Sequence, residues 1–228
     1  GRAAMGFRRK ALLLLLATLS SGLLQESHLR RKAPDLFGPL PPAPPSRGEK
    51  RPEVLAPAGG WPQLKAAIAN GADAVYFGLS HFSARARASN FDVDELQDVV
   101  AYCREHEVAA YAAVNTLVFD DELGSVKALL GKCKEADVDA VIVQDLAVQR
   151  LALELGIEVH ASTQQSVGDS LAARFAADRG ATRVVLGREL SVADIRQVVA
   201  DTGLDVEVFV HGALCVSWSG QCLSSEAW

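Results

Sequence analysis

The sequence is poor in cysteine, with four among 228 residues, which excludes a small fold held together by disulfides. Cys103 and Cys133 lie in helical patterns, and we interpret them as buried structural thiols because free cysteine is among the most buried residue types. The sequence contains neither GxSxG nor HExxH, so a serine or zinc peptidase lacks its usual signature. The segment "PAGGWPQ" after the first expected strand is not a Rossmann phosphate loop, which weakens a dinucleotide-binding interpretation.

Basic residues are scarce in the main part of the chain. Residues 51–228 hold fourteen Lys and Arg against twenty-five Asp and Glu, whereas residues 1–50 hold nine against three. Phosphate attraction supplies most non-specific affinity for nucleic acids. The main part is therefore not expected to bind RNA through a broad basic face, and an RNA partner would need a local basic pocket.

One long apolar stretch is present, from Ala11 to Leu24, and polar residues interrupt its fourteen residues. A membrane span needs about 20 apolar residues, so we expect a signal-peptide core and no stable span in the mature protein. The basic "HLRRK" and the proline-rich "PLPPAPPSRG" follow, and the latter is typical of an extended linker. We therefore divide the chain into a targeting leader and linker over residues 1–50 and a folded domain over residues 51–228. A signal-type core followed by a basic stretch fits a leader into a plastid, with secretion as the alternative.

From Glu53 onward, short β-rich runs alternate with helical patterns in which apolar residues recur at i, i+3 and i+4, as Leu64, Ala67 and Ile68 do. Strand and helix in repetition predict a parallel sheet with crossover helices. We expect an α/β fold, a (β/α)8-type parallel barrel that is incomplete at its C-terminus with about seven strands. An open doubly wound sheet is the alternative. The expected strands cover residues 53–57, 73–78, 108–115, 139–145, 157–162, 182–189 and 205–212.

Polar side chains follow these strands at their C-terminal ends, which form the functional face of a parallel barrel. We expect one cavity at that face to hold His160, Arg188, His211 and Cys215. Catalytic roles are assigned to His160, His211, Arg188 and Glu189. The structural alternatives are a buried core histidine for His160 or His211 and an internal ion pair between Arg188 and Glu189.

Substrate binding is expected from residues at the same face and in the connection after the second strand. Two arginines over a barrel mouth can clamp a carboxylate or phosphate, although a solvated loop is the alternative. Helix capping is the alternative for Asp145, as it is for Ser162 and Thr163. The assigned residues are Arg85, Arg87, Asn115, Gln144, Asp145 and Gln164.

Cys215 and Cys222 lie seven residues apart near the end of the chain, in a stretch where Gly212 and Gly220 permit tight turns. Two thiolates at this spacing suit iron–sulfur or zinc ligation, although the spacing is weakly specific. A nucleophile pair of Cys215 and His211 is the competing interpretation, and the spacing alone does not decide between them.

Eight fragments of the sequence together resemble the collagenase-like peptidase family, the thirty-second family of unassigned catalytic type. The resemblance covers about residues 53 to 225. The fragments occur in the family's order: "LAPAG", "NGADAVYFG", "ARARASNF", "NTLVF", "VIVQDL", "VHASTQ", "VVLGREL" and "EVFVHGALCVSWSGQCLSS".

This resemblance implies an enzyme that hydroxylates a pyrimidine in transfer or ribosomal RNA, or a quinone precursor. It also implies a 4Fe–4S cluster on four cysteines, of which Cys215 and Cys222 are the first two, and we consider a small carboxylate as the hydroxyl donor. We expect the other two ligands on sequence beyond Trp228, so the chain is expected to be a fragment. A peptidase, following the family's name, and a non-catalytic barrel fragment are the alternatives.

Overall fold

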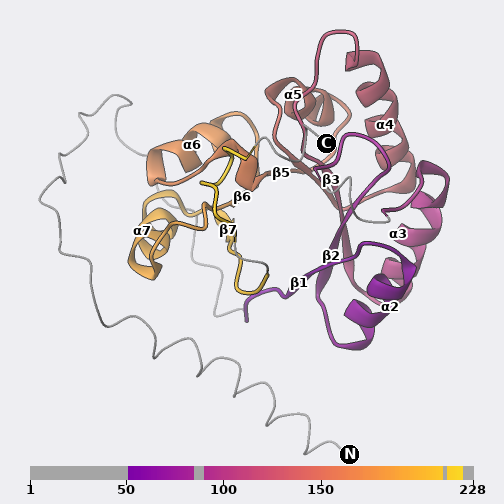
Figure 1. Ribbon diagram of the computed structural model, residues 1–228, viewed down its shortest axis with the longest axis horizontal. Helices are drawn as coiled ribbons and strands as arrows, with labels where there is room; N and C mark the ends of the chain where they lie inside the picture. The colour runs from indigo at the N-terminus through magenta and orange to yellow at the C-terminus, as the bar shows by residue number, and fades with distance from the viewer. Residues whose placement is uncertain (1–50, 85–89, 213–214, 223–228) are drawn as a thin grey trace, which may run out of the picture. The chain divides into compact units, whose positions relative to one another are not determined.

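The computed structural model describes residues 51–84, 90–212 and 215–222. The expected leader over residues 1–50 lies outside these described residues, as do Arg85 and Arg87. Seven strands form one sheet in which each neighbouring pair is parallel (Figure 1). Their bounds are β1 (Leu55–Pro57), β2 (Ala74–Gly78), β3 (Ala109–Val114), β4 (Ala140–Val143), β5 (Val159–Ala161), β6 (Arg183–Val185) and β7 (Asp205–Glu207).

Helices occupy the connections between the strands, as the alternating pattern predicts. The longest, α4, has 14 residues, and no helix within the described residues is long and apolar enough to cross a membrane. The α-helices are α2 (Trp61–Ala69), α3 (Leu96–Glu105), α4 (Leu123–Ala136), α5 (Leu146–Glu154), α6 (Ser170–Asp178) and α7 (Val192–Thr202), and the 3-10 turns are η1 (Val93–Glu95) and η2 (Thr163–Gln165).

The strands follow one another across the sheet in sequence order, from β1 to β7. A doubly wound sheet requires a reversal of strand order, so that alternative is excluded. The fold is therefore an α/β half-barrel with β1 and β7 at its two edges, which confirms the expected incomplete barrel of about seven strands.

Side chains of the strands alternate between two faces of the sheet, as the pleat requires. One face packs on the helices, where Val75 and Phe77 of β2 and Leu64 of α2 are fully buried in one apolar cluster. The other face looks into the half-barrel. There, Tyr111 of β3 and His160 of β5 meet edge to face, with ring centroids 4.7 Å apart. The inner face thus carries polar side chains such as His160 and Tyr111.

The last strand is shorter than expected, because β7 ends at Glu207 rather than extending to Gly212. Its hydrogen-bonding partner β6 ends at Val185, and the ladder finishes with the bond from the Leu186 N–H to the Glu207 carbonyl. Among the described residues, no strand pairs with the chain beyond this point, and Val210 is 75% exposed. The apolar alternation that predicted a long strand therefore continues past the end of the sheet.

Candidate functional site

A loop over residues 215–222, here called the cysteine loop, carries both exposed cysteines and is attached to the barrel through Ser219. The Ser219 N–H donates to Oε1 of Glu189 at 2.7 Å. Its hydroxyl accepts from the backbone N–H and the Nε–H of Arg188, both at 3.1 Å. Arg188 also donates to the carbonyl of Ser217 at 3.1 Å. Arg188 and Glu189, which were assigned catalytic roles, therefore both contact the cysteine loop, where they hold it in place.

A second contact seats the same loop on the turn after β5. The hydroxyl of Ser166 donates to the Ser219 carbonyl at 2.9 Å. Gly220 next to it adopts a φ of +79°, and a Cβ at that position would lie 2.8 Å from the backbone oxygen of Gln164. Only glycine fits both the backbone conformation and the close approach. Ser219 is consequently buried, at 6% exposure, in a loop that is otherwise largely exposed.

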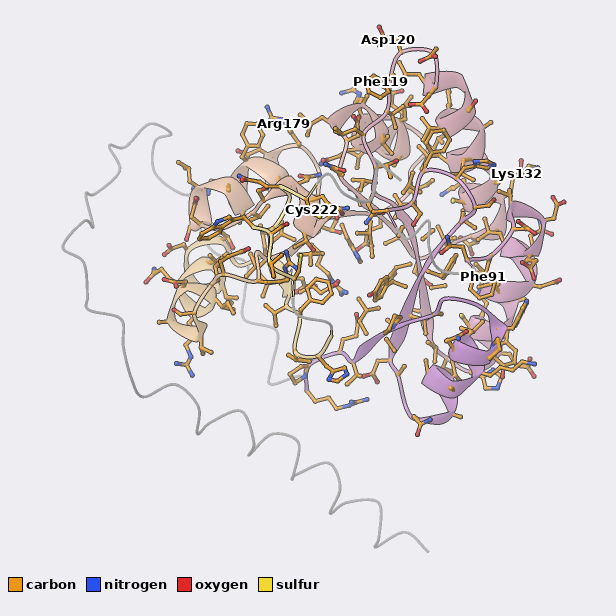
Figure 2. The ribbon with its side chains drawn as sticks, viewed as in Figure 1. Phe91, Phe119, Asp120, Lys132, Arg179 and Cys222 are labelled. Carbon is orange, nitrogen blue, oxygen red and sulfur yellow. The ribbon has the colours of Figure 1, made fainter. Side chains whose placement is uncertain are left out.

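Both cysteines of the loop are exposed (Cys222 is labelled in Figure 2). The Arg188 side chain beside Cys215 donates a hydrogen bond that lowers the pKa of this thiol, and a backbone hydrogen bond involving Ser217 adds to the effect. Thiolates are the form of cysteine that binds metals or attacks substrates. The loop therefore favours a reactive Cys215, which suits both chemistries that the spacing predicts.

The other two cysteines do not complete a metal site. Cys103 in α3 and Cys133 in α4 are buried, and burial raises the pKa of the two thiols to about 11 and about 12. Within the described part of the chain, no group of three or more His, Cys, Asp or Glu is arranged to hold a metal ion. Cys215 and Cys222 fit as thiolate donors to an iron–sulfur cluster, but they supply only two of its four ligands.

Polar residues at the C-terminal ends of β3 and β5 form a second group next to the cysteine loop. Asn115 donates from Nδ2 to Oε1 of Gln164 at 2.9 Å and accepts from the Ala84 N–H at 3.0 Å. The hydroxyl of Ser162 donates to the same Gln164 oxygen at 2.5 Å. Because the Gln164 backbone also supports Gly220, this amide group and the cysteine loop share one end of the barrel.

Asp145 serves as the N-cap of α5, which was the alternative considered for it. Its Oδ1 accepts from the N–H of Ala147 at 2.7 Å and of Val148 at 3.2 Å. Its other oxygen accepts from the Val118 N–H at 3.4 Å, which ties down the loop before α4. Gln144 lies directly before this cap, between β4 and α5, and its assignment to substrate binding stays a prediction.

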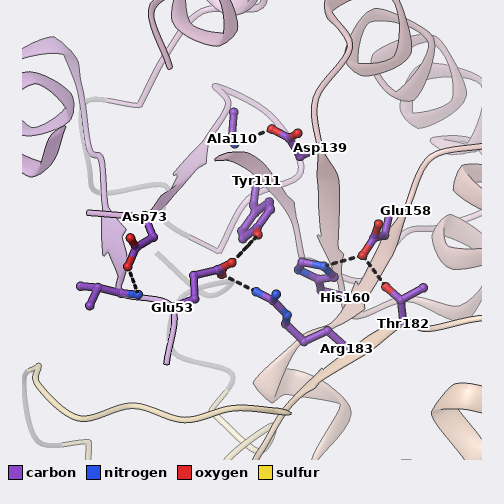
Figure 3. A network of polar contacts seen from close by, with 10 residues as sticks. Glu53, Asp73, Ala110, Tyr111, Asp139, Glu158, His160, Thr182 and Arg183 are labelled. Carbon is purple, nitrogen blue, oxygen red and sulfur yellow. Dashed lines mark hydrogen bonds and ion pairs between the residues drawn. The ribbon is translucent and has the colours of Figure 1, made fainter. Parts of the chain in front are cut away.

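His160 does not lie with Arg188 and the cysteines, so the expectation of one shared cavity is wrong for this residue. His160 occupies the middle of β5 and is 1% exposed. Its Nε2 is 3.3 Å from Oε1 of Glu158, which precedes the strand, and it pairs in register with Arg183, the first residue of β6. Its contacts are thus at the N-terminal ends of the strands (Figure 3). Burial, followed by the charge of Arg183, lowers the pKa of His160 to about 4.

The surroundings of His160 form a polar network inside the half-barrel (Figure 3). Glu53, which precedes β1, accepts from Nη1 of Arg183 at 2.7 Å and from the Tyr111 hydroxyl at 3.2 Å. Burial raises the pKa of Tyr111 to about 12 and that of Glu207 in β7 to about 7. Nδ1 of His160 and Oε2 of Glu207 are buried and have no hydrogen-bond partner among the described residues. These contacts link β1, β3, β5 and β6 at the end of the barrel away from the cysteine loop, which favours a structural role for them.

Several residues that build the site were not singled out by the sequence. Ser219 and Ser166 were missed because a serine among polar residues carries no spacing signal. Gly220 stands directly before "QC" and was noted only as permitting a turn. His211 lies beyond the end of β7 and is exposed. Its pairing with Cys215 stays a prediction.

Comparison with known proteins gives a consistent set of relatives. The model of peptidase family U32 matches residues 59–228. An uncharacterized protease of Methanocaldococcus jannaschii is 43% identical over 179 residues, which cover 76% of this chain and 44% of that protein. The 23S rRNA 5-hydroxycytidine synthase of Escherichia coli is 40% identical over 175 residues, covering 77% and 26%. The tRNA hydroxylation protein P1 of Bacillus subtilis is 34% identical over 179 residues, covering 78% and 42%.

The chain spans less than half the length of each of these three relatives. Among solved structures, a U32 peptidase matches with a TM-score of 0.59 at 15% identity, over 72% of this chain and 70% of the other. At that identity the likeness concerns the fold alone. It agrees with the parallel half-barrel derived from the strand order.

Proposed function

The chain belongs to peptidase family U32, and from that premise we propose that it acts in the hydroxylation of a pyrimidine in transfer or ribosomal RNA. Two of the relatives carry names for this chemistry, one on tRNA and one on 23S rRNA. Another relative is named as a protease, so the family as a whole is one of enzymes with more than one named reaction.

The observation that carries the proposal is the fixed seat of the cysteine loop. A loop whose cysteine acts only as a nucleophile needs a single thiol with a general base next to it. Here Ser219, with four hydrogen bonds to two neighbouring loops, fixes a segment with a cysteine near each end. Rigid support from surrounding hydrogen bonds is what metal ligands require. Cys215 and Cys222 are accordingly proposed as two ligands of a 4Fe–4S cluster.

When bound, such a cluster supplies one-electron chemistry. The chain's own residues hold the cysteine loop in place and offer polar groups to a substrate. Arg188 holds the loop and places its positive charge beside Cys215. Asn115 and Gln164 offer amide groups at the same end of the barrel for a polar substrate. A small carboxylate as hydroxyl donor would find its clamp in Arg85 and Arg87, which lie outside the described residues.

RNA analysis tests the proposal directly. The protein, extended to the length of its relatives, is produced without oxygen in a bacterium that lacks its own RNA hydroxylation proteins, and the nucleosides of total RNA are measured by mass spectrometry. We expect a 5-hydroxypyrimidine with this wild-type protein and its loss with Cys215→Ala or Cys222→Ala. Cys103→Ser is the matched control, because this buried thiol is remote from the loop. Unmodified RNA with every chain would contradict the proposal.

A peptidase remains the second candidate because the pKa of Cys215 is lowered, as a nucleophilic thiol requires. The assay is cleavage of denatured collagen by the purified chain. Cleavage that is lost in Cys215→Ser and retained in Cys222→Ala would favour this candidate, because a cluster needs both thiols whereas a nucleophile is a single one.

The leader over residues 1–50 is proposed to direct the protein to a plastid, on the strength of its signal-type core and basic stretch. Residues 1–50 fused to a fluorescent protein should accumulate in plastids of a plastid-bearing cell. Appearance of the fusion in the medium would favour secretion instead.

A further inference from the structure

The surface beside the cysteine loop is hollowed by a cavity of about 590 Å³. Three loops form its walls, namely the turn between β5 and α6, the turn between β6 and α7, and the cysteine loop. No lysine or arginine is among the residues that line it in the described part of the chain. The residues that line it include Gly187, Glu189, Asp194, Trp218 and Ser219.

Trp218 presents its indole to this cavity from a fixed backbone. The side chain is 68% exposed, although the next residue, Ser219, is only 6% exposed and makes four hydrogen bonds, to Ser166, Arg188 and Glu189. The loop therefore anchors itself through the serine and leaves a large aromatic surface open to solvent. Nucleic-acid-binding proteins use exposed aromatic rings of this kind as stacking surfaces for unpaired bases.

The cavity wall also carries the carboxylate of Glu189. Oε1 of Glu189 is occupied by the Ser219 N–H at 2.7 Å. The other oxygen, Oε2, lies next to Gly187, and a Cβ at position 187 would be only 2.9 Å from it. The absence of a side chain at Gly187 therefore leaves room for this carboxylate in the cavity wall. Asp194 adds a second acidic side chain. Carboxylates repel phosphate and accept hydrogen bonds from N–H groups, such as N4 of cytosine.

We infer that this cavity receives the pyrimidine base that is modified, stacked on Trp218 with its N–H edge directed to Glu189. The inference rests on the proposed function and names the position of its substrate. Enzymes that modify a base take it out of the stack into a pocket. Trp218 lies between Cys215 and Cys222 in the sequence, so a base stacked there is next to the thiols. The carboxylates of Glu189 and Asp194 repel the RNA phosphates, so the uncharged base enters the cavity and the phosphates stay outside.

Photocrosslinking tests the position of the base. A single-stranded hexanucleotide of uridine with one 5-iodouridine is bound to the full chain, irradiated, and the crosslinked peptide is mapped by mass spectrometry. We expect the crosslink at Trp218. Trp218→Phe keeps a stacking ring and should retain binding, measured by fluorescence anisotropy, whereas Trp218→Ala should weaken it about tenfold or more. Val216→Ala is the matched control, because Val216 is 98% exposed on the same loop and does not line the cavity.

The outcomes separate the cavity from the function as a whole. A crosslink that maps elsewhere, or unchanged affinity in Trp218→Ala, overturns the cavity assignment while RNA hydroxylation stands. Equal, Trp218-dependent binding of oligoadenylate overturns the choice of a pyrimidine. If no oligonucleotide binds and cellular RNA is unmodified, the proposed function fails and this inference fails with it.

Discussion

Arg183 donates a hydrogen bond of 2.7 Å to Glu53, a residue 130 positions earlier in the chain. The contact joins the first residue of β6 to the segment before β1 across the inside of the half-barrel. β1 is an edge strand of only three residues, and this bond links the segment before it to β6, which is remote in the sequence.

We expect Arg183→Met to lower the free energy of unfolding by about 2 kcal/mol, because Glu53 and the Tyr111 hydroxyl lose a partner in a partly buried setting. Arg183 and Glu53 are 17% and 35% exposed. Arg150→Met is the control, since Arg150 pairs with Glu154 at 77% and 51% exposure and such pairs contribute about 0.5 kcal/mol or less. Urea unfolding followed by circular dichroism measures both. Equal effects of the two substitutions would show that the buried pair is dispensable.

His160 should make the protein less stable in acid. Its folded-state pKa is about 4, below the ordinary 6.5, because burial favours the neutral ring. A group whose pKa is depressed in this way binds its proton more readily when unfolded. Its contribution to stability is therefore present above pH 6.5 and is lost as the pH falls toward 4, by up to about 3 kcal/mol.

Glu207 should have the opposite effect in the same network. Burial raises its pKa to about 7 from 4.5, so its contribution is present below pH 4.5 and is lost as the pH rises through 7. Between pH 4.5 and 6.5 the two slopes oppose each other, and we expect the free energy of unfolding of the wild type to change little there.

Substitutions should separate these two slopes. Glu207→Gln leaves the histidine alone, so stability should rise between pH 4.5 and 6.5. His160→Asn leaves the acid, so stability should fall between pH 4.5 and 7. The charged groups that face His160 are Glu158, Arg183 and Glu53, and both variants keep all three. Urea unfolding at half-unit pH steps is the measurement, and flat profiles in both variants would mean that these groups titrate normally.

The seat of the cysteine loop gives an expectation about thiol reactivity. Ser219→Ala removes the acceptor of two hydrogen bonds from Arg188, and because Arg188 is exposed these donors then bind water, at a net cost of about 1 kcal/mol. The loop should then detach locally, while the barrel keeps its stability. With Arg188 displaced, alkylation of Cys215 at pH 7 should slow severalfold, because its pKa returns toward the ordinary value. Ser217→Ala is the matched control, since Arg188 contacts only the backbone carbonyl of Ser217. Identical alkylation rates in both variants would show that the hydrogen bonds of Ser219 do not position Arg188 beside Cys215.

Much of the fold could be predicted from local patterns. Apolar residues at helical spacing, such as Leu64, Val99 and Val126, are all fully buried, and all seven expected strands are present. The expected strands are too long mainly at their C-terminal ends. There, polar residues such as Asn115 leave the ladder to bond with other loops. Hydrophobic alternation marks where a strand can form, but the partner strand decides where it ends, as β6 does for β7.

The candidate site was harder to predict because it depends on contacts between distant segments. The sequence places His160 near the end of an expected strand, yet its neighbours in space are Glu53 and Arg183, which no local pattern connects to it. Ser219 is an ordinary residue in the sequence, and its role follows only from two loops that converge on it. Cys215 and Cys222 were found because cysteine is rare and chemically distinctive, whereas the serines and glycine that position them are neither.

Iron binding tests the two cysteines as ligands. A 4Fe–4S cluster takes four thiolates, and one chain offers two that are exposed, since Cys103 and Cys133 are buried with raised pKa values. We therefore expect that anaerobic reconstitution with iron and sulfide leaves the monomeric 228-residue chain without a stable cluster. Two chains can pool four cysteines, so any brown fraction should be a dimer with about two iron atoms per chain. Size-exclusion chromatography with light scattering, metal analysis and visible absorption distinguish these cases.

Substitutions decide whether any cluster uses the loop. Cys215→Ala and Cys222→Ala should each abolish the visible absorption, because a cluster that loses two of its four ligands in a dimer is not retained. Cys103→Ser should leave it unchanged, which controls for general loss of thiols. A monomer that binds four iron atoms, or a cluster that survives both loop substitutions, would show that the ligands lie elsewhere. In that case the lowered pKa of Cys215 would favour its role as a nucleophile, and the peptidase candidate would take precedence.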